Sequence, residues 1–267
     1  IVNKFFYKKY LKHFLQYLRN IFFKTGYKIS PIDKSHWEDQ KDLLSEIQVE
    51  CILDIGANEG AVSKKYASLF PEARVISFEP IPELANLVKI NCPRAEVYEL
   101  AVYNKEKNNM IFHVNNLIDT SSIYESEDNF LPEDYNSHQD LKSKISVSCC
   151  TLDKFTLDKN INTINILKVD IQGAELKVFE GAKRLLEKKQ IDLIYTEVFF
   201  LPFYKNMPLF NDISSYLTSY GYSFHGFYNE SHSGYTGKLQ WCDAIFLSPK
   251  LNKKSINLLK KSMSRKE

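Results

Sequence analysis

Glycine is scarce in this sequence, with 9 among 267 residues, although the hydrophobic and charged fractions, 44% and 25%, are ordinary for a globular protein. Long apolar runs are missing too, and none approaches the roughly 20 residues that a membrane-spanning helix needs. No G-x-x-x-x-G-K followed by Ser or Thr occurs, so a P-loop nucleotide site finds no support. These absences leave a globular chain that is long enough for one large α/β domain or two small ones.

Cysteine and histidine lack the spacing of metal ligands. The five cysteines form no C-x-x-C pattern and the six histidines are scattered, so we expect no metal ion. The aromatic, lysine-interrupted start of the chain has no small-residue cleavage site, so a secretory signal is not expected. We therefore expect a cytoplasmic protein whose thiols are reduced and packed in the core. The cysteines are Cys51, Cys92, Cys149, Cys150 and Cys242.

Basic residues gather at both ends of the chain. Residues 1–28 contain seven lysines or arginines and no acidic residue, and residues 250–267 contain seven more against Glu267 alone. The part between them is acidic, which argues against a nucleic-acid groove through the centre. The two ends are candidates for contact with an anionic surface.

The N-terminal residues also predict an amphipathic helix. Apolar side chains recur at steps of four and three residues and share one helical face, with lysines beside it. Such a helix suits the inner face of an anionic membrane, but its apolar face could equally pack on the domain or in a homodimer. Both alternatives remain open from the sequence. The apolar face consists of Val2, Phe6, Tyr10, Phe14, Leu18 and Ile21.

From residue 51 onward, short apolar runs alternate with amphipathic ones. This alternation predicts a parallel sheet with helices on both faces. Two runs near the end, 222–229 and 242–248, are separated by turn residues around Gly234 and Gly237 and predict an antiparallel hairpin. The other expected strands are 51–55, 74–78, 96–102, 110–114, 144–152, 164–170 and 191–200. The expected helices are 60–70, 82–92 and 174–189.

Two of the few glycines lie in "ILDIGANEG", between the first expected strand and its helix. Glycine tolerates positive φ and allows a ligand to approach the backbone. The G-x-G-x-x-G fingerprint of dinucleotide sites is not met by Gly56 and Gly60. Glu79 ends the second strand, where an acid can accept hydrogen bonds from both hydroxyls of a ribose. A ribose without phosphates, beside a backbone loop, describes S-adenosylmethionine.

These residues carry a family resemblance. The segments "LDIGANEG", "ISFEP", "ELAV", "DTSS" and "LKVDIQGAE" resemble the FkbM family of S-adenosylmethionine-dependent methyltransferases over roughly residues 50–248. The resemblance implies a Rossmann-like class I methyltransferase fold, a seven-stranded sheet ending in the antiparallel hairpin. It also implies methylation of a hydroxyl, which we expect on a sugar, glycan or glycolipid. A non-sugar hydroxyl and a catalytically silent binding protein of the same fold are the alternatives.

On this basis we expect three parts along the chain. A basic helical extension covers residues 1–45, the methyltransferase domain covers 46–249 and a basic tail covers 250–267. Residues 115–143 form a loop inserted in the domain, polar and without periodicity.

The resemblance assigns the cofactor residues. The methionine part would be held by Asp54 and the loop after it, and we expect free loop amides to bind its carboxylate. Glu79 would hold the ribose with Pro80 beside it. Ala101 and Val102 would line the adenine, although simple core packing explains them as well. The loop residues are Gly56, Ala57, Asn58 and Gly60.

Two acids are candidates for the transfer step. Asp170 and Glu197 each end an expected strand, on the side where parallel sheets bind ligands. Either carboxylate could orient the cofactor or accept a proton from the acceptor hydroxyl. Asp170 has no adjacent acid to complete a metal-holding pair. Glu175 is expected instead to satisfy free amides at the start of a helix.

The acceptor is expected to meet the inserted loop. The resemblance and the short polar side chains place the "DTSS" segment at the pocket, and His138 in the same loop is a candidate base. The expected acceptor residues are Asp119, Thr120, Ser121, Ser122 and His138.

Overall fold

The structure is a computed structural model that describes residues 35–117, 120–126, 141–234 and 236–264, with side chains up to residue 256. The chain divides into two compact units, residues 1–40 and 41–267. The first unit is described only from residue 35. Helix α2 (His36–Leu43) begins at the following residue. The expected N-terminal amphipathic helix therefore lies outside the described residues. No helix in the described ranges is long and apolar enough to cross a membrane.

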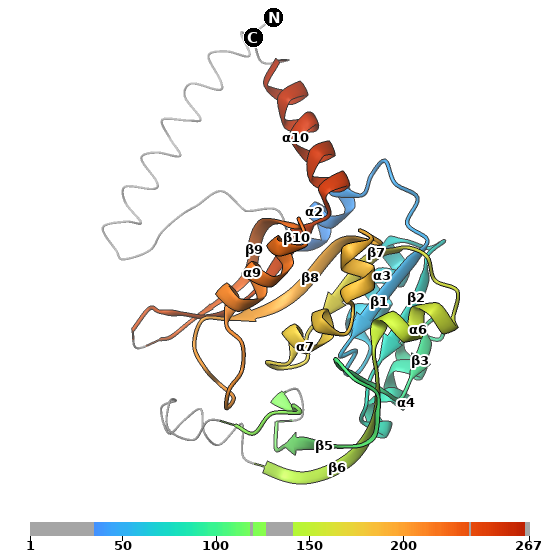
Figure 1. Ribbon diagram of the computed structural model, residues 1–267, viewed down its shortest axis with the longest axis vertical. Helices are drawn as coiled ribbons and strands as arrows, with labels where there is room; N and C mark the ends of the chain where they lie inside the picture. The colour runs from blue at the N-terminus through green and yellow to red at the C-terminus, as the bar shows by residue number, and fades with distance from the viewer. Residues whose placement is uncertain (1–34, 118–119, 127–140, 235, 265–267) are drawn as a thin grey trace, which may run out of the picture. The chain divides into compact units, whose positions relative to one another are not determined.

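The larger unit is built on a seven-stranded sheet in the order β3-β2-β1-β7-β8-β10-β9 (Figure 1). The first five of these strands are parallel, and β10 runs antiparallel to both β8 and β9. This confirms the expected seven-stranded methyltransferase sheet with its terminal hairpin. The strands are β1 (Cys51–Ile55), β2 (Arg74–Phe78), β3 (Glu96–Tyr98), β7 (Ile164–Val169), β8 (Ile191–Phe199), β9 (Ser223–His232) and β10 (Leu239–Leu247).

The central strands are almost wholly apolar because helices cover both faces of the sheet. One face packs into a single large core with four helices, to which Leu53, Leu167 and Ile194 contribute. Those helices are α6 (Leu152–Asp158), α7 (Glu175–Glu180), α8 (Lys183–Glu187) and α9 (Phe210–Ser219). On the other face α3 (Ala61–Leu69) reaches β1 and β2 through Ser63.

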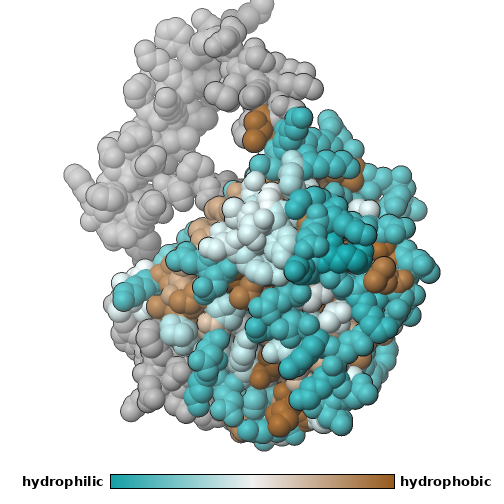
Figure 2. All heavy atoms as spheres, in the orientation of Figure 1, coloured by the Kyte–Doolittle hydropathy of each residue, from teal (hydrophilic) through white to brown (hydrophobic). Residues whose placement is uncertain are grey.

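Two further helices complete this unit. Helix α4 (Pro82–Asn91) begins at Pro82, as its sequence predicts. The basic tail forms helix α10 (Pro249–Ser264), which Leu251 anchors by burial. Exposed large apolar side chains lie singly on different elements, such as Ile90 on α4 and Leu157 on α6. The surface in view in Figure 2 is accordingly mostly hydrophilic.

Several expected elements differ from the structure. The run 96–102 is not one strand, because β4 (Ala101–Val102) leaves the main sheet and pairs with Cys149 and Cys150. The expected helix 174–189 divides into α7 and α8 at Gly181, where a Cβ would lie 2.2 Å from the carbonyl oxygen of Tyr103. Helices α6 and α9 were not expected. Strand propensity and helical periodicity do not reveal where a strand leaves one sheet to pair with a segment that is distant in the sequence.

A second, three-stranded sheet stands beside the carboxyl ends of the main strands. It has the order β4-β6-β5, with β5 (Lys107–Asn115) antiparallel to β6 (Leu141–Cys150). Residues 120–126, between these strands, form two bridges, from Ser122 back to β5 and from Ser126 to Tyr204. This segment is thereby held over the ends of β7 and β8.

Candidate cofactor and acceptor site

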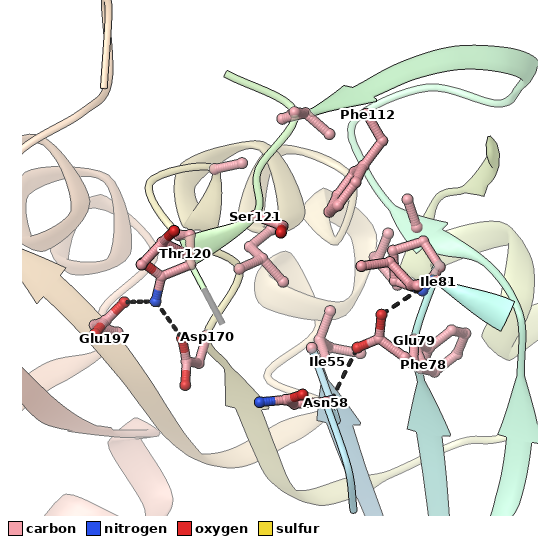
Figure 3. Close-up of a pocket in the computed structure, with 18 of the residues that line it drawn as sticks. Ile55, Asn58, Phe78, Glu79, Ile81, Phe112, Thr120, Ser121, Asp170 and Glu197 are labelled. Atoms are coloured by element: carbon pink, nitrogen blue, oxygen red, sulfur yellow. Dashed lines mark hydrogen bonds between the residues drawn. The ribbon is translucent and has the colours of Figure 1, made fainter. Parts of the chain in front are cut away.

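A cavity of about 660 Å³ opens at the carboxyl ends of β1, β2, β7 and β8. The second sheet and the 120–126 segment close it on one side (Figure 3). Ten of the residues predicted from sequence line it: Gly56, Asn58, Glu79, Pro80, Ala101, Val102, Thr120, Ser121, Asp170 and Glu197. Asp119 and His138 lie outside the described residues.

Glu79 directly follows β2 and presents a buried carboxylate to the cavity (Figure 3). Its Oε2 accepts the amide of Asn58 at 2.9 Å and its Oε1 accepts the amide of Ile81 at 3.0 Å. Burial raises the pKa of Glu79 to about 7, although both amides oppose the shift. Each oxygen retains a second lone pair, so the carboxylate can still accept hydroxyl hydrogen bonds.

The glycine loop is tightly packed against β7. Gly56 has φ +77°, and a Cβ there would lie 1.9 Å from the carbonyl oxygen of Asp170. The amides of Gly56 and Ala57 both donate to Phe78 O at 3.0 Å. The amide of Gly60 donates to Ala57 O, and that of Asn58 is taken by Glu79. The expectation that these four amides are free for a ligand carboxylate is therefore wrong, because three of them bind Phe78 or Glu79 and the fourth binds within the loop.

Asp54 lies beneath the cavity and does not line it. Its side chain is fully buried, accepts from Ser63 Oγ at 2.6 Å and pairs with Lys168 Nζ at 3.1 Å. Lys168 also donates to Gly56 O at 2.7 Å and lies 3.7 Å from Asp170 Oδ2. Burial acts to lower the pKa of Lys168, but the Asp54 and Asp170 carboxylates outweigh it and raise that pKa. Lys168 thus ties the glycine loop to the end of β7, a role that sequence reasoning missed.

Asp170 and Glu197 approach one another across the ends of β7 and β8. The side-chain amide nitrogen of Gln172 donates to both, at 3.2 Å to Asp170 Oδ1 and at 2.8 Å to Glu197 Oε2. Figure 3 marks both bonds as dashed lines. Burial raises the pKa of Glu197 well above its usual range, and Asp170, Glu175 and Asp243 raise it further.

Glu175 is a structural residue, but it binds amides of the turn before α7, whereas the sequence predicts that it caps the start of the helix. Its Oε1 accepts the amides of Ile171 at 3.0 Å and Gly173 at 3.2 Å, just before α7. The side chain is fully buried and outside the cavity lining. Burial raises the pKa of Glu175 to about 7.

The remaining walls divide the cavity into an apolar end and a mixed end. Ala101 and Val102 line the apolar end together with Phe78 and Ile81. Ser122 of the expected acceptor segment points instead to Gln172 O, to which it donates at 2.7 Å.

At the mixed end, three aromatic residues that the sequence did not single out line the cavity near Glu197: Phe199, Phe203 and Trp241. The sequence shows that these residues are aromatic, but it does not show that they line the same cavity. Among the described side chains, no group of three or more His, Cys, Asp and Glu residues is arranged to hold a metal.

Comparison with known proteins agrees with this geometry. The methyltransferase FkbM domain matches residues 54–224. The 2-O-methyltransferase NoeI of Sinorhizobium fredii is 32% identical over 156 residues, which cover 55% of this chain and 62% of NoeI. The AMB antimetabolite synthetase AmbE of Pseudomonas aeruginosa is 25% identical over 158 residues, 49% of this chain and 7% of AmbE. The matches thus span less than two thirds of either relative.

Solved methyltransferase structures are also similar at low identity. A precorrin-6y C5,15-methyltransferase from Geobacter metallireducens has 12% identity and a TM-score of 0.40, covering 79% of this chain and 87% of that one. The METTL16 methyltransferase domain has 10% identity and a TM-score of 0.45, covering 80% and 66%. Because the family match extends over well over half of the sequence, from β1 to β9, the chain belongs to the FkbM methyltransferase family.

Proposed function

We propose that this protein is an S-adenosylmethionine-dependent O-methyltransferase that acts on a hydroxyl of a sugar, glycan or glycolipid. The observation that carries the proposal is one cavity with Glu79 at one end and the Asp170–Glu197 pair at the other. Cofactor recognition and proton transfer can therefore occur in the same enclosed space. The relative NoeI, named a 2-O-methyltransferase, supports transfer to oxygen.

The residues at the apolar end fit S-adenosylmethionine. Glu79 offers two carboxylate oxygens to the ribose hydroxyls, while its own backbone partners keep it in place. Ala101, Val102 and Ile81 supply an apolar wall for the adenine. Gly56 and Asn58 border the space for the methionine part. When bound, the cofactor supplies a methyl group on a positively charged sulfonium.

At the other end, this chain supplies the groups that an alcohol acceptor needs. Asp170, which is 40% exposed and lies beside Lys168, accepts the hydroxyl proton. Glu197, with its raised pKa, keeps its own proton and orients the hydroxyl by hydrogen bonding. Phe203 and Trp241 offer aromatic surface to the less polar face of a sugar ring. Holding the hydroxyl oxygen in line with the bond that breaks lowers the activation barrier of methyl transfer, chiefly by orientation.

The test combines cofactor binding with an acceptor panel. Calorimetry should show S-adenosylmethionine binding, weakened about 30- to 150-fold in Glu79→Ala, because the ribose hydroxyls lose their acceptors and unpaired buried donors cost about 2–3 kcal/mol. Glu83→Ala, which changes an exposed carboxylate on α4, is the matched control.

Release of S-adenosylhomocysteine is then measured with free sugars, glycolipids and phenols. No cofactor binding by the wild type would refute the methyltransferase activity. Turnover with phenols alone would refute the sugar acceptor.

A further inference from the structure

Gln172 occupies a central place between the two acids of the cavity. It follows β7 and has φ +57°, a left-handed conformation that is uncommon for glutamine. Its Nε2 is bonded to Asp170 and to Glu197 at once, at 3.2 and 2.8 Å. Sequence reasoning assigned it no role. A residue held in an uncommon conformation, with both amide hydrogens on acids, merits a functional explanation.

The other atoms of Gln172 fix which way its amide faces. Its Oε1 lies 2.9 Å from the hydroxyl of Tyr204, which is also 2.8 Å from Thr120 O. Its backbone oxygen accepts from Ser122 Oγ. The Tyr204 hydroxyl donates to the amide oxygen, and an ionised Asp170 carboxylate can only accept, so the NH2 group faces the acids and the oxygen faces Tyr204. Gln172 thereby joins the acid pair to the 120–126 segment, which lines the cavity.

We propose that Gln172 is a positioning residue of the acceptor site, holding the Asp170 and Glu197 carboxyl groups together and coupling them to residues 120–126. The acceptor part of this inference rests on the proposed function. Its structural part, that the amide sets the protonation equilibrium of the acid pair, can be tested without any acceptor.

The charges around Glu197 explain why such a donor matters. Asp170 at the end of β7, Glu175 on α7 and Asp243 on β10 all raise the pKa of Glu197, and Asp170 does so both by its charge and by a hydrogen bond between the two side chains. Lys168, the cation beside Asp170, is engaged with Asp54, Gly56 and Asp170. The Gln172 N–H therefore gives Glu197 a stabilising partner among acids, and removing a donor to the charged form raises a carboxyl pKa.

The first measurement needs no acceptor. The protein is labelled with 13C at its carboxyl groups, the Glu197 resonance is assigned with Glu197→Gln, and its pH titration is followed. In Gln172→Met, which keeps the shape but has no amide, we expect the titration midpoint to rise by about one pH unit. Affinity for S-adenosylmethionine should stay within about twofold, since the hydrogen bonds of the Gln172 amide go to Asp170, Glu197 and Tyr204 and not to the residues around Glu79.

Two further variants keep this result interpretable. Gln172→Asn suits positive φ but is one methylene shorter, so it should fold and should also raise the midpoint. Gln190→Met is the matched control, because the Gln190 amide also bonds at both ends, to Asn162 O and Arg184, away from the cavity. An unchanged Glu197 titration in both Gln172 variants would overturn the proposal.

Kinetics with an acceptor identified in the panel complete the test. We expect kcat to fall about 10- to 100-fold in Gln172→Met, with the KM for S-adenosylmethionine unchanged. Tyr204→Phe, which loses the hydroxyl that orients the amide, should show a smaller loss. A full kcat in Gln172→Met would also overturn the positioning role. Failure of the wild type to turn over any acceptor would refute the proposed function, while the NMR titration would still decide the role of Gln172.

Discussion

At the scale of single residues, Glu175 makes the stability of the folded protein depend on pH. Its Oε1 holds two loop amides, while its Oε2 is buried without a hydrogen-bond partner. In the folded protein it keeps its proton up to about pH 7, whereas the ordinary value is 4.5. The folded state thus binds more protons between these values, and stability falls as the pH rises through them.

Glu175→Gln should remove this pH dependence, because an amide oxygen can accept the same two bonds and carries no charge. We expect the free energy of unfolding of the variant, relative to wild type, to increase by about 3 kcal/mol between pH 4.5 and pH 8. Urea unfolding at several pH values measures it, with Glu83→Gln as an exposed control. Parallel curves for variant and wild type would mean that Glu175 is ionised in the folded protein at neutral pH.

At the scale of elements, the site depends on how closely β1 and β7 approach. Their register pairs Asp54 with Lys168, and the loop after β1 touches the end of β7 at Gly56. A methyl group at Gly56 would require both a positive φ and a shift of the Asp170 backbone.

Gly56→Ala should therefore destabilise the protein by about 3 kcal/mol and abolish binding of S-adenosylmethionine. Gly237→Ala is the control: its φ is +66°, but no atom of the described residues, apart from its two chain neighbours, lies within 4 Å of the added Cβ. The control should cost only about 1 kcal/mol and leave cofactor binding intact. Thermal unfolding and calorimetry measure both variants, and equal losses in the two would show that the strand approach is not what requires glycine.

Also at the scale of elements, strands were easier to predict than the breaks between them. The strands β1, β2, β7 and β8 follow from compact apolar runs with charged residues at their ends. The break between α7 and α8 falls at Gly181, where the backbone of Tyr103 leaves no room for a side chain, and the sequence does not show this approach of a distant segment. The amides of the glycine loop were predicted to be free, since the sequence does not show that Phe78 O accepts two of them.

At the scale of the whole molecule, the basic residues at both ends of the chain lead to a further prediction. We propose that residues 1–28, which lie outside the described residues, attach the protein to anionic membranes, with the lysines of the C-terminal tail adding to the attraction. The full chain should co-sediment with phosphatidylserine-containing vesicles at low salt, and less so as salt increases. Deletion of residues 1–28 should abolish it. A full-length protein that stays in the supernatant, and is dimeric by light scattering, would assign the apolar face to a protein contact.

The sequence by itself determined the main sheet, the family and the places of Gly56 and Glu79 at the cavity. The reason is that Gly56 and Glu79 each lie in the turn directly after their own strand, so local pattern and position suffice. Only the tertiary structure decided what surrounds Asp170 and Glu197. Gln172, Tyr204 and Trp241 come from separate segments and come close because β7, β8 and β10 are neighbours in the sheet: Tyr204 bonds to Gln172 and belongs to the cluster on which Trp241 packs. Asp54 shows the same limit, since its burial against Lys168 follows from the register of two strands far apart in the chain.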